Sequence, residues 1–115
     1  MTQRIERVEK LAQQVLGETI NELKDPRIGF VTVTRVRVSK DLRHARVLVG
    51  VLGTPDEQAE TMKGLASARP YLRTVLGAEI RMKYLPELVF ELDEGASTAQ
   101  RIQGLLRAIE QEQRD

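Results

Sequence analysis

The strongest constraint on this chain is its opening order of elements, a helical pattern followed directly by two strand patterns. Apolar residues recur every three or four positions from Ile5 to Leu23, which predicts an amphipathic helix with one buried stripe. Thr2 is the expected N-cap, and Pro26 ends the helix because it disfavours helical angles at Asp25. The stripe consists of Ile5, Val8, Leu11, Ala12, Val15, Leu16, Thr19, Ile20 and Leu23.

A run of β-branched residues within 28–38 predicts the first strand, but its phase is ambiguous. Alternation places Val31 and Val33 on one face, and Val36 and Val38 on the other. Either a β-bulge shifts the phase, or the sheet buries the even-numbered residues throughout. We favour the second interpretation, which exposes Arg35 and Arg37. The residues that it buries are Ile28, Phe30, Thr32, Thr34, Val36 and Val38.

Two more strands are predicted, over 45–52 and from residue 80 to about residue 92. In the second strand Arg46 is exposed, and the buried parity is Ala45, Val47, Val49 and Val51. In the third strand Pro86 interrupts the ladder, at an edge or a bulge. One face of that strand carries Ile80, Met82, Tyr84, Leu88, Phe90 and Leu92, and the other carries Arg81 and Lys83.

A capping signature between the second and third strands starts another helix. Thr54 is the expected N-cap, Pro55 the first helical residue, and Glu57 the partner that completes a capping box. A proline inside a helix removes a hydrogen bond and clashes with the preceding turn. We therefore expect the helix to break or bend at Ala68-Arg69-Pro70, to restart at Pro70 and to end at Gly77.

The complete order is α-β-β-α-kink-α-β plus a C-terminal helix that starts near Ser97. We divide the chain into a domain over 1–96 and a helix and tail over 97–115. This α+β order is the layout of a type II KH domain, a three-stranded sheet with helices on one face. KH domains that bind nucleic acid carry a GxxG loop. Here Gly50-Val51-Leu52-Gly53 ends a strand instead of joining two helices, so we interpret it as a turn.

The charge is unevenly distributed although the net charge is only +1. Residues 1–50 carry ten basic and six acidic residues, whereas residues 78–115 carry five and eight. A basic first half can steer association with a polyanion, although two ordinary solvated surfaces would show the same composition. Aromatic residues make up 3% of the chain, which supplies few platforms for stacking single-stranded bases.

Several separate motifs, taken in order, are similar to the ribosome-binding factor A family. They are Arg4-Ile5-Glu6-Arg7-Val8, Leu23-Lys24-Asp25-Pro26-Arg27, Val36-Arg37-Val38-Ser39-Lys40-Asp41-Leu42, Ala45-Arg46-Val47, Tyr71-Leu72-Arg73 and Pro86-Glu87-Leu88-Val89-Phe90, followed by Asp93. The family resembles a KH domain whose GxxG loop is replaced by an Ala-x-Gly kink. In this chain Ala68 and Arg69 match the first two positions, and Pro70 replaces the glycine.

The resemblance implies a non-catalytic assembly factor. Such a protein would bind the immature 30S subunit and its 16S rRNA in the cytoplasm, assist late maturation including that of the 5′ end, and matter most in the cold. It would work as a monomer, without a cofactor, a metal or a membrane anchor. The alternative is a protein-interaction module of the same fold that does not bind RNA.

Basic residues are the candidate rRNA contacts, because Arg and Lys neutralise phosphates. They are Arg4, Arg7, Lys10, Arg27, Lys40, Arg43, Arg46, Arg69, Arg73, Arg81 and Lys83. We expect helix one and the kink to form one continuous basic face with the hairpin at its rim. A second patch would lie on the open face of the sheet, formed by Arg35, Arg37, Arg81 and Lys83.

Ordinary structural roles compete with these assignments. Arg27 has Asp25 beside it as an ion-pair partner, and exposed strand positions would also account for Arg35 and Arg37. His44 is better explained as a surface turn residue than as a catalytic one, since no nucleophile motif accompanies it. Turn and cap roles explain Asp25, Asp41 and Asp93 better than a metal cluster does.

Overall fold

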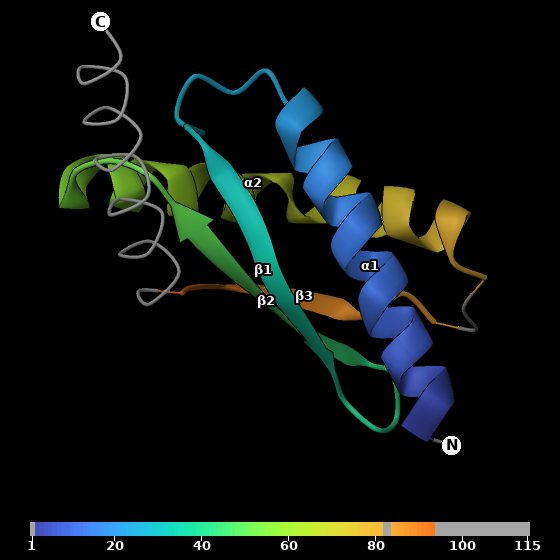
Figure 1. The fold of residues 1–115 in the computed structure, drawn as a ribbon. Coiled ribbons are helices and arrows are strands. Elements are labelled where there is room, and N and C mark those ends of the chain that lie inside the picture. Colours follow the sequence, from blue (N-terminus) through green and yellow to red (C-terminus); the bar gives the residue numbers. More distant parts are fainter. Residues whose placement is uncertain (1, 82–83, 94–115) are drawn as a thin grey trace, which may run out of the picture.

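The computed structural model describes residues 2–81 and 84–93, which form an α+β fold (Figure 1). Its elements are α1 (Thr2–Glu22), β1 (Val31–Val38), β2 (His44–Val51), α2 (Pro55–Glu79) and β3 (Glu87–Leu92). The strands form one sheet in the order β1-β2-β3, with β1 antiparallel and β3 parallel to β2. This confirms the predicted KH-like fold. The helix predicted from Ser97, and with it the division at residue 96, lies outside the described residues.

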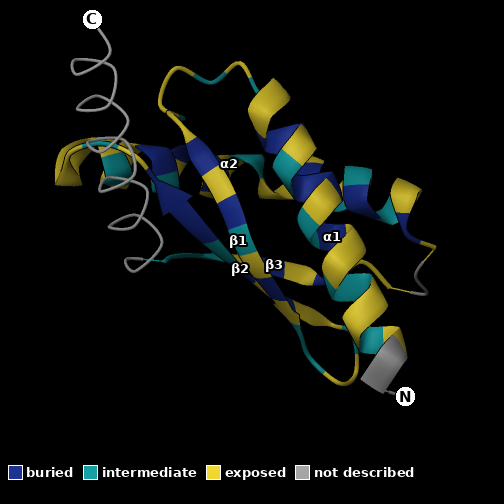
Figure 2. Ribbon diagram, viewed as in Figure 1, coloured by how far each residue is buried: buried dark blue, intermediate teal, exposed yellow. Residues whose placement is uncertain are grey.

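Both helices pack against the same face of the sheet and enclose one core. On α1, Ala12, Leu16 and Ile20 recur every fourth residue and are almost completely buried, while the outer flank is exposed (Figure 2). The stripe is narrower than predicted, because Leu11 is 41% exposed. The other buried contributions come from Leu65, Leu72 and Leu76 of α2 and from Ala45, Val47, Val49 and Val51 of β2.

The favoured phase of the first strand is wrong, and the bulge interpretation is right. The register shifts between Val33 and Arg35, which leaves Thr34 as the extra residue of β1. Its hydroxyl, which has one hydrogen to donate, lies 2.8 Å from the Asp93 carboxylate and 3.2 Å from the Leu48 carbonyl oxygen, and this shared hydrogen bond stabilises the bulge. The buried residues are therefore Val31, Val33 and Val36, while Phe30, predicted to be buried, is 81% exposed.

The bulge still leaves Arg35 and Arg37 exposed, as expected, because it changes the phase before both of them. The first helix ends slightly earlier than predicted, at Glu22, and the following connection leads through Pro26 to β1.

The predicted capping box of α2 is confirmed. The Glu57 backbone N–H donates to the Thr54 hydroxyl at 3.2 Å, and the Thr54 N–H donates to the Glu57 carboxylate at 3.1 Å. The second bond lowers the pKa of Glu57, because it favours the charged carboxylate.

The predicted break at Ala68-Arg69-Pro70 is wrong, because α2 continues through Pro70 to Glu79, while the alternative, a bend within the continuous helix, stays a prediction. Pro70 cannot donate to the Ala66 carbonyl one turn earlier. The Arg69 side chain takes over this role, since its Nε donates to the Ala66 carbonyl at 3.1 Å. Pro70 is exposed, so its ring needs no space in the core. The helix therefore tolerates the proline, and the predicted restart at Pro70 and end at Gly77 are also wrong.

The third strand is shorter than predicted and begins at Glu87. Ile80 instead caps α2, and its N–H donates to the Leu76 carbonyl at 2.8 Å. Pro86 is fully buried directly before β3, so the residue without an N–H lies outside the ladder. Because Tyr84 also precedes the strand, its predicted inward orientation is wrong, and its side chain is 54% exposed.

Two glycines in helices should respond oppositely to alanine. A Cβ at Gly64 of α2 would lie 2.6 Å from Ile28 Cγ1, whereas a Cβ at Gly17 of α1 would have no heavy atom within 4 Å. We expect Gly17→Ala to raise the free energy of unfolding by roughly 0.5–1 kcal/mol, because alanine favours a helix interior. Gly64→Ala should lower it by about 1–3 kcal/mol through overpacking. Urea unfolding measures both, and an equal gain in the two variants would show that α2 does not depend on close contact with Ile28.

A double-mutant cycle tests how α2 accommodates its proline. In the parent protein, Arg69→Met should lower the free energy of unfolding by about 0.5–1.5 kcal/mol, because the Ala66 carbonyl loses its donor. In a Pro70→Ala background residue 70 supplies its own N–H, so Arg69→Met should have little effect there. The same loss in both backgrounds would show that the Arg69 side chain does not compensate for the proline.

Candidate nucleic-acid interface

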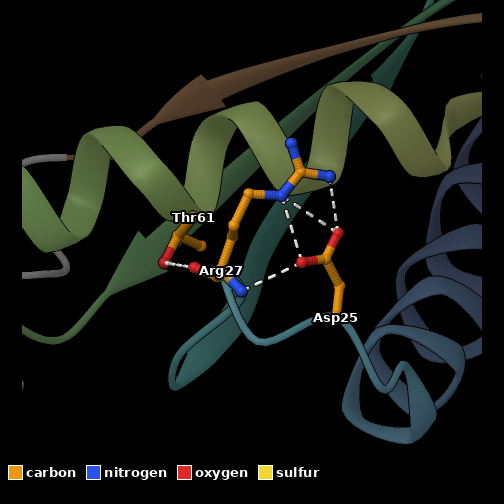
Figure 3. Close-up of polar contacts among 3 residues, drawn as sticks. All are labelled: Asp25, Arg27 and Thr61. Atoms are coloured by element: carbon orange, nitrogen blue, oxygen red, sulfur yellow. Dashed lines mark hydrogen bonds and ion pairs between the residues drawn. The ribbon is translucent and has the colours of Figure 1, made fainter.

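Arg27, one of the predicted RNA contacts, is engaged in an ion pair within the fold (Figure 3). Its Nη2 lies 2.7 Å from the Asp25 carboxylate, and its Nε and backbone N–H also donate to that group. These hydrogen bonds lower the pKa of Asp25. The Arg27 carbonyl accepts a hydrogen bond from the buried Thr61 hydroxyl at 3.2 Å, which holds this loop against α2. The structure thus supports the structural role for Arg27, an ion pair with Asp25.

On the open face of the sheet, Arg46 is paired as well. Its guanidinium lies 2.6 Å from the Glu91 carboxylate of the neighbouring strand, and this contact lowers the pKa of Glu91. Arg37 stands directly opposite Arg46 in the ladder, where like charges repel. Glu91 offsets that repulsion. Among the described residues, the unpaired positive charge of this face is therefore concentrated on β1, at Arg35 and Arg37.

The structure gives Arg73 of α2 a structural role. Its Nε donates to the Pro86 carbonyl at 2.9 Å, and its Nη2 donates to the Leu85 carbonyl at 3.1 Å. The fork of the guanidinium places two separate nitrogens against two adjacent carbonyls, an arrangement that the single nitrogen of a lysine does not reproduce. Arg73 therefore fastens the connection between α2 and β3 to the helix.

The β1–β2 loop is held in one conformation by its own side chains. Asp41 accepts hydrogen bonds from the Ser39 hydroxyl at 2.6 Å and from the Arg43 backbone N–H at 3.1 Å, and both lower its pKa. Leu42 has a φ of 61°, a left-handed conformation that is rare for a bulky residue. The Arg43 guanidinium lies over the Tyr84 ring, 5.4 Å from its centroid.

Two hollows meet at Tyr84. The first, of about 250 Å³, lies between the start of α1, the β1–β2 loop and the end of α2, and its lining includes Arg4 and Arg81. The second, of about 380 Å³, includes Arg43 and Arg73. We call these residues the Tyr84 cluster: Tyr84, Arg4, Arg43, Arg73 and Arg81. Three parts of the chain that are far apart in the sequence, namely the start of α1, the β1–β2 loop and the residues at and after the end of α2, thus gather positive charge around one exposed aromatic ring.

The other predicted contacts are dispersed. Arg7 and Lys10 lie on the exposed flank of α1, and Lys40 is exposed in the β1–β2 loop. Lys83 lies outside the described residues. The groove between α1 and α2 is lined by three glutamates, Glu18, Glu22 and Glu79, so the expected continuous basic face across the two helices does not form there.

Tyr84 is the residue of this site that the sequence analysis missed. A signal for it was present, because Tyr84 follows Arg81 and Lys83, and aromatic residues placed among basic ones are typical of RNA-binding surfaces. We missed this signal because we predicted a strand from residue 80. In such a strand the alternation of side chains places Tyr84 on the face that points into the core.

The other chemistry-bearing groups within the described residues are few. They include no cluster of three or more His, Asp or Glu side chains that could hold a metal ion. His44 is exposed, as predicted, and its Nε2 lies 4.0 Å from the Glu87 carboxylate. Neither described helix is long and apolar enough to cross a membrane.

Comparison with known proteins identifies the family of this chain. The family model described as "Ribosome-binding factor A" matches residues 4–106 of this chain. The chain belongs to the ribosome-binding factor A family. A family member from Halothermothrix orenii is 42% identical over 112 residues, which cover 96% of this chain and 92% of that protein.

Solved structures of ribosome-binding factor A have the same fold. The crystal structure of the protein from Thermus thermophilus matches with a TM-score of 0.69 and 31% identity, covering 76% of this chain and 94% of that one. A homology model of the Thermus thermophilus factor, fitted into a cryo-electron-microscopy map of a 30S complex, matches with a TM-score of 0.61 and 31% identity. That match covers 72% of this chain and 88% of the other.

Replacing an arginine by lysine distinguishes an arginine that stabilises the fold from one that is only exposed at the surface. Arg73→Lys should lower the free energy of unfolding by about 1.5–3 kcal/mol, because the single nitrogen of lysine does not reproduce the two separate donors that Arg73 places against the Leu85 and Pro86 carbonyls. Arg35→Lys, at an exposed strand position, is the control and should stay within about 0.5 kcal/mol of the parent. Chemical unfolding compares the two, and an unchanged stability for Arg73→Lys would refute the anchoring role.

Proposed function

We propose that this protein binds the small ribosomal subunit and its precursors through phosphate contacts with 16S rRNA, and assists late maturation, including processing of the 5′ end, without catalysing a reaction. Membership of the ribosome-binding factor A family supports the binding role, and the Thermus factor fitted into a 30S complex names the partner. A factor with this partner works in the cytoplasm, and we expect it to act as a monomer that needs no cofactor.

The Tyr84 cluster is the observation that links the proposed rRNA binding to particular residues. The guanidinium groups of Arg4 and Arg81 make no hydrogen bond or ion pair within the described ranges, so their charges are available to a ligand. Arg27 and Arg46, by contrast, are neutralised by Asp25 and Glu91. We therefore place the principal rRNA contact at the Tyr84 cluster, with the exposed Arg7, Lys10 and Lys40 contributing from its surroundings.

Paired charge reversals test this placement. Arg4→Glu with Arg81→Glu should weaken binding to 30S precursors and reduce the slope of log affinity against log salt by about one for each phosphate that is no longer neutralised. Arg35→Glu with Arg37→Glu, on the open sheet face, is the matched control and should preserve the slope. Co-sedimentation over a salt series measures both variants. If only the sheet-face pair loses binding, the rRNA lies on the open face of the sheet.

A second candidate function is a protein-interaction module that does not contact RNA. It is favoured by Phe30, which is 81% exposed, and by the adjacent Leu52, whose N–H donates to the Phe30 carbonyl at 3.1 Å. An apolar contact of this kind would be insensitive to salt. Subunit binding that does not change across the salt series, for the parent and for both charge-reversal pairs, would favour this function over rRNA binding.

A further inference from the structure

We propose that the hollow between Tyr84, Arg4 and Arg81 receives a single unpaired base of the rRNA, stacked on the Tyr84 ring. This inference rests on the proposed rRNA binding and adds the kind of contact that the site makes. It concerns a part of the fold away from Ala68-Arg69-Pro70, the segment that corresponds to the GxxG loop of other KH domains.

The size of the hollow suits one base. Its volume of about 250 Å³ is smaller than the roughly 300–1,000 Å³ of pockets that hold drug-sized ligands. Three segments supply its lining: the first turns of α1, the β1–β2 loop, and Ile80, Arg81 and Tyr84 after α2. A double helix cannot enter a space of this size, whereas a base turned out of its stack presents a thin, flat face.

The walls of the hollow combine apolar surface with positive charge. Val8, Leu42 and Ile80 contribute apolar side chains, and Tyr84 contributes an aromatic ring that is 54% exposed. Arginines at positions 4 and 81 line the same hollow. An exposed ring next to free guanidinium groups offers a stacking surface for the base and partners for the phosphates on either side of it.

The ring and the loop are arranged before any ligand arrives. Arg43 lines the second hollow and lies over the Tyr84 ring at 5.4 Å, which helps to fix the ring's position. Leu42 holds its strained φ of 61° within a loop whose hydrogen bonds run from Ser39 and Arg43 to Asp41. Strained residues that the surrounding contacts maintain are concentrated at binding sites.

The charges of the hollow favour a nucleotide over a protein side chain. A lysine or arginine from a partner would meet Arg4, Arg81 and Arg43, and the one acidic residue of the lining, Asp41, is already hydrogen-bonded within its loop. An apolar side chain would cover the ring but leave the arginines without a partner. A nucleotide provides a flat apolar face and a negative charge together, so it satisfies both parts of the lining.

Two tyrosine variants and a matched control test the inference with the full-length protein and 30S precursors. Tyr84→Leu removes the stacking surface and should weaken binding by about 5-fold to 150-fold. Its salt slope should remain that of the parent, because every phosphate contact is kept. Tyr84→Phe keeps the ring and should bind within about threefold of the parent. Tyr71→Leu, at the chain's other tyrosine, is the control, because Tyr71 is 56% exposed in the glutamate-lined groove, and it should bind as the parent does.

Chemical probing of the precursor rRNA identifies the occupant. The parent and Tyr84→Phe should protect one unpaired nucleotide that Tyr84→Leu leaves reactive. Unchanged affinity of Tyr84→Leu would overturn the inference while leaving rRNA binding intact. Weakened binding with no change at any nucleotide would mean that a protein side chain fills the hollow, which also refutes it. If the parent protein itself does not bind precursors, the proposed function fails first.

Discussion

The central strand β2 is the element on which the rest of this structure depends. It pairs with β1 on one side and β3 on the other, and its inward residues Ala45, Val47, Val49 and Val51 are at most 1% exposed. Both helices cover this row of side chains. Burial of apolar area is the main favourable term in folding. The inward side chains of β2 lie in the core into which the other elements also bury their apolar side chains. The start of β2 therefore determines where the β1–β2 loop, one part of the candidate site, emerges.

Arginine has two distinct uses in this molecule, which the count of basic residues does not separate. Arg69 and Arg73 donate to backbone carbonyls, and Arg27 and Arg46 pair with carboxylates. Each of these replaces solvation of the charge by contacts within the fold. What remains for a polyanion is the positive charge that no carboxylate neutralises, and part of it gathers around Tyr84, where Arg73 keeps its charge because its partners are neutral carbonyls. The proposed interface is consequently more local than the number of arginines in the first half of the chain implies.

The continuity of α2 also bears on function. Where other KH domains have a loop between two helices, this chain has one helix stabilised across Pro70 by the preceding arginine. A continuous helix does not present the free backbone N–H groups with which a GxxG loop clamps a nucleic-acid backbone. The proposed contacts with rRNA therefore use side chains elsewhere, in the arginine-lined hollow between the start of α1, the β1–β2 loop and the end of α2.

Local patterns in the sequence were sufficient to predict the helix stripe of α1, the buried parity of β2, the capping box at Thr54 and the KH-like order, because each depends on neighbours a few residues apart. Local periodicity offered the bulge as one of two interpretations of β1 but could not decide between them, since Leu48 and Asp93, the partners that stabilise Thr34, are remote in the chain. The same reason explains the exposure of Tyr84 and the ion pair between Arg46 and Glu91. The sequence by itself determined the elements and their order. Only the tertiary structure decided which arginines are occupied and which surround Tyr84, because charge pairing depends on distances between segments that local periodicity does not encode.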